Sequence, residues 1–271
     1  MPITRILLWL SVLPCLLAAQ PKTYTNSIGM EFVLAPAGSF VMGKFAPACA
    51  EAGTRDFVTE SHYQECVKLA REAALPGFKA EVPRPFYVGK FEVTQQQYRQ
   101  VMGKNPSYHT EDKVGEPSSD YPVDSISWQD AQAFIRRMNA LEKTNAYRLP
   151  TEVEWEYAAG AGTDARPQTG AQTREVAWYR LNSGYVTHPV GQKTPNAWGL
   201  YDMLGNVWEW VQDWYDYQVV PSGPSGPVSG KVHVLKGGGF QCYQRMARVP
   251  AHAGGPGTTV SLGFRVVREA R

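Results

Sequence analysis

The sequence predicts a globular domain of the α+β class with little regular secondary structure, and two features of its composition support that class. Of its 271 residues, 43% are hydrophobic and 12% are aromatic, which is enough to build a sizeable core. Glycine and proline together make up 45 residues, one in six, and so favour short elements with many turns over long bundled helices. This composition excludes a disordered polymer, a collagen and a multi-span membrane protein. A formal net charge of +2 gives no sign of binding to nucleic acid or to an anionic membrane.

The first 19 residues are predicted to be a cleavable signal peptide. Arg5 is the short positive region, residues 6–17 are mostly apolar, and Leu17-Ala18-Ala19 has the small residues of a cleavage site. Roughly a dozen apolar residues are too few to span a bilayer as a helix, which takes about 20, although a membrane anchor is the alternative. We therefore expect export to the periplasm and a single mature domain over residues 20–271.

Short strands are predicted towards both ends of the mature chain. Residues 30–43 indicate two strands around a Pro-Ala-Gly turn, and residues 86–93 indicate a third. Residues 232–235 and 262–267 are the last two candidates. Between the early strands, residues 44–84 differ in character, and we interpret them as an insertion.

Three cysteines remain once the signal peptide is removed, an odd number for an oxidising compartment. Cys49 and Cys66 flank a short acidic stretch, and we expect them to form a disulfide that pins the insertion, which carries a predicted helix over residues 60–74. Cys242 is then the remaining thiol. It is either a small buried hydrophobic side chain or a reactive or metal-binding sulfur.

Three helices are predicted from one recurring capping signal. In each, a hydroxyl residue stands three positions before a side chain that reaches back to its backbone N–H. In the middle helix, apolar residues recur at intervals of three and four and so form one face against a core. The three pairs are Thr94 with Gln97, Ser127 with Asp130, and Thr151 with Glu154.

Regular periodicity fades after residue 160, and such a long irregular stretch needs aromatic packing, a metal or both to hold it. Residues 196–210 are its most informative part. Asp202 and Glu209 offer carboxylate oxygens and the Gly205-Asn206 turn exposes carbonyls, which are the ligands that a hard cation such as calcium requires. The alternative is that these side chains only bond backbone groups in a tight turn.

Seven motifs, taken in order, closely resemble the formylglycine-generating-enzyme family, also called the sulfatase-modifying-factor family. They cover nearly all of the mature chain except the insertion. The resemblance implies one compact domain related to the C-type-lectin fold, and it implies bound calcium. The motifs are residues 26–32, 91–98, 122–128, 147–157, 199–210, 236–240 and 262–266.

The resemblance also assigns calcium ligands to positions in this chain. A second family site would begin at Asn182 and Ser183, but the acidic loop that completes it is missing before residue 187. The family's better-kept calcium loop falls on Asp202, Gly205, Val207 and Glu209, the last two through a carbonyl and a carboxylate.

The catalytic pattern of the family is only half present. Its authentic members oxidise a substrate cysteine to formylglycine with oxygen, copper(I) and two cysteines five positions apart, a soft pair that suits copper(I). The first cysteine matches Cys242, and the second falls on Ala247. One thiolate does not complete a two-coordinate copper site, so we do not expect this chain to make formylglycine.

Side chains near Cys242 are candidates for binding a ligand. An arginine is always charged and suits an anion, and a histidine in a Pro/Gly loop titrates near neutral pH. The alternatives are surface salt bridges and a solvated histidine. The candidates are Tyr243, Arg245, Arg248 and His252.

The signal peptide, the length, the insertion and the halved cysteine pair resemble the periplasmic branch of the family that matures the chromophore of the siderophore pyoverdine. This implies an oxidoreductase that acts on a peptide-derived small molecule, with Cys242 as its catalytic residue. Two other classes stay open: a calcium-braced module that binds peptide or glycan without chemistry, and a structural accessory of a periplasmic assembly.

Overall fold

The structure, a computed structural model, describes residues 22–43, 60, 64, 77–163, 170–215, 226–243, 246–255 and 257–270. The signal peptide, Cys49, Cys66 and Arg245 lie outside these residues, as does nearly all of the helix expected over residues 60–74. Within the described ranges the predicted α+β class is confirmed, because short strands and short helices alternate with long loops. No described helix has the length and apolar character needed to cross a bilayer.

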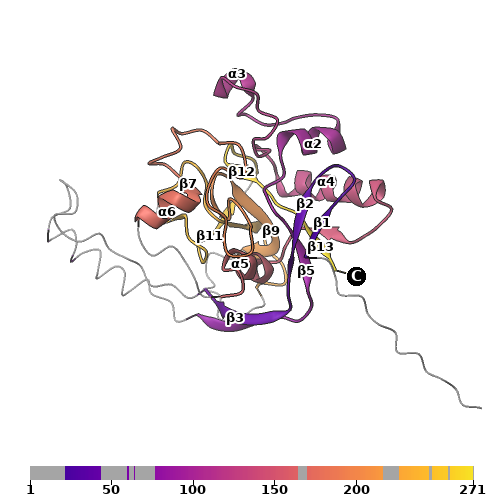
Figure 1. The fold of residues 1–271 in the computed structure, drawn as a ribbon, viewed down its shortest axis with the longest axis vertical. Coiled ribbons are helices and arrows are strands. Elements are labelled where there is room, and N and C mark those ends of the chain that lie inside the picture. The colour runs from indigo at the N-terminus through magenta and orange to yellow at the C-terminus, as the bar shows by residue number, and fades with distance from the viewer. Residues whose placement is uncertain are drawn as a thin grey trace, which may run out of the picture.

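A five-stranded antiparallel sheet brings the two ends of the domain together (Figure 1). Strands β5 (Phe86–Gly89) and β13 (Val267–Glu269) lie inside it and pair directly with each other. The last strand of the chain is therefore not an edge but a centre of the sheet. The flanking strands are β1 (Thr23–Thr25), β2 (Glu31–Ala35) and β6 (Tyr147–Arg148).

A four-stranded sheet forms the other half of the domain. Its centre is the antiparallel pair β9 (Trp208–Tyr215) and β10 (Val232–Lys236), and its edges are β11 (His252–Gly255) and β12 (Leu262–Gly263). The single strand predicted over residues 262–267 is thus wrong in one respect. It is two strands in different sheets, because the chain crosses from one sheet to the other between β12 and β13.

The predicted insertion ends earlier than residue 84. Strand β4 (Phe78–Val82) pairs over its full length with β3 (Gly38–Met42), and Ala80 and Val82 are buried in the core. These residues belong to the framework of the domain, so the boundary of 44–84 is corrected to a point before residue 78. The alternation of apolar and charged residues from 78 to 82 is the signal of a half-buried strand.

The three helix starts predicted from capping are confirmed. Each one forms a full capping box, in which the hydroxyl accepts from the third residue and that residue's side chain accepts from the cap backbone. Two further helices, α3 and α6, were not predicted. The helices are α2 (Gln95–Met102), α3 (Glu111–Val114), α4 (Trp128–Leu141), α5 (Glu152–Ala159) and α6 (Gly170–Val176).

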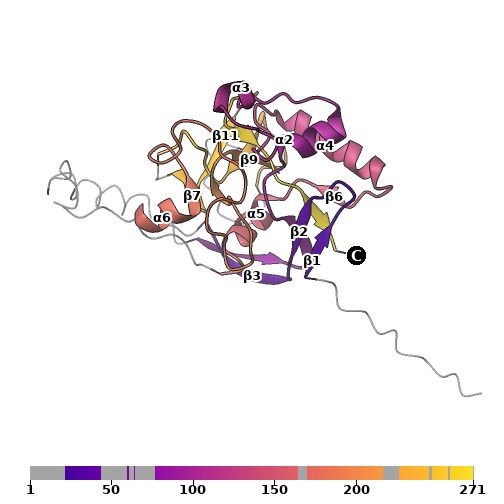
Figure 2. The same cartoon turned by 45° about the horizontal axis from the view of Figure 1, so that its top comes forward.

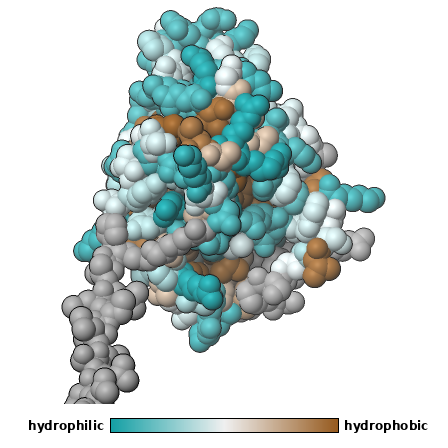
Figure 3. Space-filling view, turned by 90° about the vertical axis from the view of Figure 1, so that its right-hand side faces the viewer, coloured by the Kyte–Doolittle hydropathy of each residue, from teal (hydrophilic) through white to brown (hydrophobic). Residues whose placement is uncertain are grey.

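The helices and the short parallel pair β7 (Ala177–Trp178) and β8 (Leu204–Gly205) surround β9. Figures 1 and 2 show α2 and α4 together on one flank of β9, whereas β7 and α6 lie on the other. On the face seen in Figure 3, hydrophobic side chains form small areas separated by polar ones. Most of the large apolar side chains are instead buried, in two clusters that contain Trp155 and Phe264 respectively.

A buried ion cluster joins α5 to β10. The ammonium of Lys236 is fully buried, 3.1 Å from Glu152 Oε1 and 3.2 Å from Glu156 Oε2. Burial lowers the pKa of Lys236, but attraction by the two carboxylates outweighs this and raises it, so the side chain stays charged. Burial raises the pKa of Glu152, yet Lys236 and His252 lower it to about 2. The cluster therefore fixes α5 against the second sheet with charges that persist at neutral pH.

We expect Lys236→Met to lower the free energy of unfolding by roughly 3–5 kcal/mol, because it leaves two buried carboxylates without their cation. Lys79→Met is the matched control, since Lys79 pairs with Glu81 on the surface and such pairs contribute less than about 1 kcal/mol. Urea unfolding at pH 7 measures both. Equal losses in the two variants would contradict a structural role for the buried cluster.

Candidate functional site

Cys242 lies in a turn that three backbone hydrogen bonds hold in place. Its N–H donates to the carbonyl of Gly239 at 2.8 Å, and its own carbonyl accepts from the N–H of Arg180 at 3.0 Å. The N–H of Phe240 donates to the carbonyl of Asn206 at 2.8 Å. The turn is thus tied to two loops that are far from it in the sequence.

The thiol of Cys242 is partly buried and has a specific partner. The indole Nε1–H of Trp208 donates to its Sγ at 3.1 Å. Burial raises the pKa of Cys242, and the hydrogen bonds from Gly239 and Trp208 oppose this only in part. The residue is therefore mainly a neutral thiol at pH 7, since the reactive cysteines of other proteins owe their thiolate form to a lowered pKa.

The position of the second family cysteine holds a buried alanine. Ala247 is 3% exposed and packs in the cluster around Trp155, whereas Cys242 packs against the cluster around Phe264. In the described part of the chain, Cys242 is the free cysteine. The residues present here do not fit a two-coordinate copper(I) centre, because that centre needs a pair of soft sulfur ligands.

A cation over two tyrosine rings borders the turn of Cys242. The guanidinium carbon of Arg180 lies 4.6 Å from the ring centre of Tyr243 and 5.3 Å from that of Tyr185. The two tyrosines are 51% and 54% exposed. Of the ligand-binding candidates from the sequence, Tyr243 is thus at this border, while Arg180 and Tyr185 were missed because they stand 60 residues away in an irregular loop.

A buried histidine and aspartate lie behind the turn. His109 Nδ1 is 2.9 Å from Asp124 Oδ2, and the His109 ring meets the ring of Phe240 edge to face at 4.9 Å. Asp124 also accepts from the N–H groups of Tyr108 and His109 and from the Ser125 hydroxyl. Asp124 belongs to one of the family motifs, but nothing in the sequence singled out its pairing with His109.

Two other candidates, His252 and Arg248, have these surroundings in the structure. His252 Nδ1 is 3.2 Å from Glu152 Oε1, so His252 belongs to the buried ion cluster around Lys236. Arg248 is partly buried, and its carbonyl accepts from the N–H of Ala251. Arg245 lies outside the described residues.

The loop assigned to calcium contains a strained, buried carboxylate. Asp202 is 2% exposed with a φ of 53°, and its Oδ2 accepts from the N–H of Gly191 at 2.7 Å. Its Oδ1 is buried with no hydrogen-bond partner in the described part of the chain. Only glycine fits at position 205, where φ is 80° and a Cβ would lie 2.1 Å from the carbonyl oxygen of Trp178.

Glu209, the other carboxylate of this loop, already forms an ion pair with Arg265. Its oxygens accept from Nε and Nη2 of Arg265, each at 2.7 Å, and from Nε1 of Trp155 at 2.6 Å. Glu92 lies in the same cluster, where burial and repulsion by Asp202 and Glu209 raise its pKa well above its usual range.

The two carboxylates of this loop, Asp202 and Glu209, differ in how well they could bind a cation. Burial is the main reason that the pKa of Asp202 rises to about 6, and a cation beside Oδ1 would relieve both the burial penalty and the missing hydrogen bond. In the described ranges, no three His, Cys, Asp or Glu side chains are arranged to hold a metal ion. Among the described residues, a cation would therefore find a free oxygen at Asp202 Oδ1, whereas both oxygens of Glu209 are already bonded to Arg265.

Asn182 and Ser183 use their side chains on backbone groups. Asn182 Oδ1 accepts from the N–H of Tyr179, and its Nδ2 donates to the carbonyl of Ala177. The Ser183 hydroxyl donates to the carbonyl of Phe240 at 2.9 Å and accepts from the N–H of Tyr185 at 3.1 Å. Ser183 thus links the segment of Tyr185 to the turn of Cys242.

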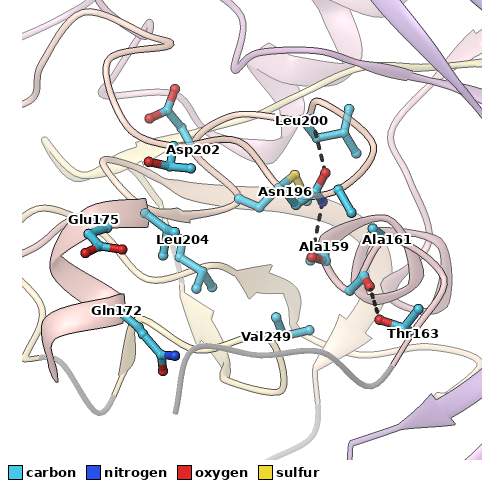
Figure 4. A pocket seen from close by; sticks show the side chains of 15 residues that line it. Ala159, Ala161, Thr163, Gln172, Glu175, Asn196, Leu200, Asp202, Leu204 and Val249 are labelled. Atoms are coloured by element: carbon cyan, nitrogen blue, oxygen red, sulfur yellow. Dashed lines mark hydrogen bonds between the residues drawn. The ribbon is translucent and has the colours of Figure 1, made fainter. Parts of the chain in front are cut away.

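A separate cavity of about 320 Å³ lies between α5, α6 and the loop before β8. Figure 4 shows Asn196 and Leu200 on one side of it, with Gln172 and Glu175 of α6 opposite. Its described lining does not include Cys242. The side chain of Asn196 is committed to the backbone of the neighbouring turn and helix end, and Asp202 of the loop assigned to calcium also lines the cavity.

The fold and the site define an α+β domain with the partly buried thiol of Cys242 in a tight turn, and the comparisons with known proteins identify its family. Residues 18–270 match the sulfatase-modifying factor enzyme 1-like domain family, so the chain belongs to that family. It is 30% identical over 237 residues to chaperone protein LppX of Paenibacillus barcinonensis. This match covers 68% of this chain and 80% of LppX. It is 34% identical over 191 residues to the formylglycine-generating enzyme of Streptomyces coelicolor, and there it spans 58% of the enzyme's length and 62% of its own.

Solved structures share this fold. Treponema denticola variable protein 1 superposes with a TM-score of 0.68 at 28% identity, over 92% of this chain and 99% of that protein. PvdO from Pseudomonas aeruginosa superposes with a TM-score of 0.66 at 24% identity, over 93% of this chain and 100% of that protein. The fold of the formylglycine-generating-enzyme family, expected from the motifs, is confirmed.

We expect Trp208→Phe to raise the pKa of Cys242, because the variant removes the hydrogen bond that favours the thiolate. The midpoint of the pH profile of iodoacetamide labelling should move up by about 0.7 pH unit, as for loss of a hydrogen bond of roughly 1 kcal/mol. Trp198→Phe is the control, since Trp198 packs on Tyr157 in the other cluster. An unchanged midpoint in Trp208→Phe would show that the indole does not tune the thiol.

Proposed function

We propose that this protein is an exported oxidoreductase that has lost formylglycine generation and completes an aromatic chromophore, that of a pyoverdine siderophore precursor. The observation that carries the proposal is the Cys242 thiol, bonded to Trp208 in a domain of this family whose second cysteine position is the buried Ala247. The scaffold supports redox chemistry at this turn, and the missing sulfur argues against the copper-dependent reaction. PvdO supports the proposal only in that its fold is shared by this protein.

The proposed reaction is a two-electron oxidation. The dihydro ring of the precursor gives up two hydrogens, as two protons and two electrons, to dioxygen, which becomes hydrogen peroxide. A ring carbon–hydrogen bond and a nitrogen–hydrogen or second carbon–hydrogen bond break, and a ring double bond forms. Cys242 contacts the substrate as a neutral thiol, and Trp208 holds its sulfur in place.

Deleting the gene in the source organism should leave a secreted siderophore that is heavier by two hydrogens and lacks the absorbance of the mature chromophore. The wild-type gene should restore maturation, and Cys242→Ala should not. Mass spectrometry and absorbance of the culture medium measure both. Arg136→Met, at an exposed position of α4, is the matched control and should restore maturation fully. Mature pyoverdine from the deletion strain, or a source that makes no pyoverdine, would remove the proposal.

A binding function without chemistry is the second candidate, and one observation favours it. LppX, a relative of which this chain spans 80%, is named as a chaperone protein. The raised pKa of Cys242 also agrees with a thiol that only lines a binding surface and does not react. Purified protein that binds peptides and takes up no oxygen with the dihydro precursor would favour this candidate over the oxidoreductase.

We also propose a structural calcium ion at Asp202, with the carbonyls of Gly205 and Val207 and the carboxylate of Glu209 as its other ligands. The partnerless, buried Oδ1 of Asp202 supports this site. Bound calcium would brace the loop before β9, and it takes no part in the proposed chemistry.

Chelation with EGTA should lower the melting temperature by several degrees, and added calcium should restore it, because an ion bound only to the folded state stabilises that state by mass action. Asp202→Asn should abolish the response to calcium while keeping the hydrogen bond to Gly191. Differential scanning calorimetry measures each step. A melting temperature that ignores both chelator and calcium would contradict the site.

A further inference from the structure

Arg180 lies over two tyrosine rings that are each about half exposed. Its guanidinium carbon lies 4.6 Å from the Tyr243 ring centre and 5.3 Å from the Tyr185 ring centre, distances at which a cation is attracted to the face of a ring. About half of each tyrosine is exposed to solvent. The arrangement presents a positive charge and two aromatic surfaces together at the surface of the molecule.

No carboxylate of the described chain neutralises this arginine. The ion pairs formed there by other arginines show the contrast: Arg265 pairs with Glu209 and Arg148 with Glu154, each within 2.7 Å. Arg180 takes part in none of the ion pairs found in the described ranges. The planar guanidinium, with its fork of N–H donors, is therefore available to an anion from outside.

The three residues are fixed beside the turn that carries Cys242. The N–H of Arg180 donates to the carbonyl of Cys242, and Tyr243 is the next residue in the chain. On the other side, Ser183 bonds both the N–H of Tyr185 and the carbonyl of Phe240. A ligand bound on this surface would consequently lie next to Cys242.

We propose that Arg180, Tyr185 and Tyr243 form a recognition site for an aromatic ring that carries a negative charge, such as a carboxylate or phenolate. The guanidinium bonds the anionic group, and the tyrosine faces stack on the ring. The site selects anionic rings over neutral and cationic ones. This inference deepens the proposed function, on which it rests for the idea that the ligand reacts at the neighbouring thiol.

Salicylate is a suitable probe, because it is planar, aromatic and anionic, and salicylamide is its neutral counterpart. Isothermal titration calorimetry should show saturable binding of salicylate to the full-length mature protein, and binding of salicylamide weaker by about tenfold, the effect of one lost charge-assisted pair. Arg180→Met should weaken salicylate binding by about tenfold as well, and Arg136→Met, on the exposed face of α4, should leave it unchanged. Tyr185→Leu is a second variant, at an exposed ring, and should also weaken binding.

A labelling experiment locates the bound probe. Salicylate should slow the reaction of Cys242 with iodoacetamide in the wild type and not in Arg180→Met. The melting temperature of each variant shows that it is folded. No binding by the wild type at millimolar salicylate, or equal binding by Arg180→Met, would overturn the site.

The outcomes separate this site from the proposed function. If salicylate binds at Arg180 while the deletion strain still secretes mature siderophore, the recognition site stands and the proposed reaction fails. If maturation depends on the gene but salicylate does not bind, the recognition site fails and the proposed reaction stands.

Discussion

Arg265 lies fully buried and donates four hydrogen bonds that join segments far apart in the chain. Two go to Glu209 in β9, one to the carbonyl of Gly89 at the end of β5, and one to the carbonyl of Tyr201 in the loop before β8. Glu209 in turn accepts from Trp155 of α5. Because residues 264–266 form the crossing between the two sheets, one guanidinium fixes both sheets, a helix and the long loop relative to one another. Removing one partner of such a buried pair leaves an uncompensated charge, which typically costs about 3–5 kcal/mol.

In the irregular half of the chain, hydrogen bonds from side chains to the backbone stabilise the loops, in the place of hydrogen bonds between paired strands. Asn206 is fully buried, and its amide bonds Glu92 and both backbone groups of His188, while its own N–H and carbonyl join Trp178 and Phe240. Aromatic stacking adds to this, as where His188 lies on Trp178 with ring centres 3.8 Å apart. The turn that carries Cys242 is therefore held in position by a buried network of polar side chains. Little regular secondary structure is needed to position the thiol.

The sequence predicted those elements of the fold that depend on residues close together in the chain, such as the helix starts. The capping pairs at Thr94, Ser127 and Thr151 involve residues three apart, so each could be read directly, and each is present in the structure. Strand β4 carried an equally local signal, the alternation from Phe78 to Val82, which the interpretation of residues 44–84 as one insertion obscured.

The site depends on contacts that no local pattern shows. Arg265 and Glu209 are 56 residues apart, and Arg180 and Cys242 are 62 apart, so neither pairing leaves a mark in the spacing of residues. His252 shows the reverse error: it is close to Cys242 in the sequence, but strand β11 carries it to the ion cluster of Lys236. The family motifs fixed where the thiol lies, and only the fold shows which side chains gather around it.

The reaction that we propose is the oxidation of an aromatic precursor by oxygen in a domain that keeps Cys242 but has Ala247 at the second cysteine position of the family. Purified protein mixed with the purified dihydro precursor in an oxygen electrode tests it most directly. One dioxygen should be consumed for each chromophore formed, and the Cys242→Ala variant should consume none. No oxygen uptake by the wild type, or equal uptake by the variant, would contradict it.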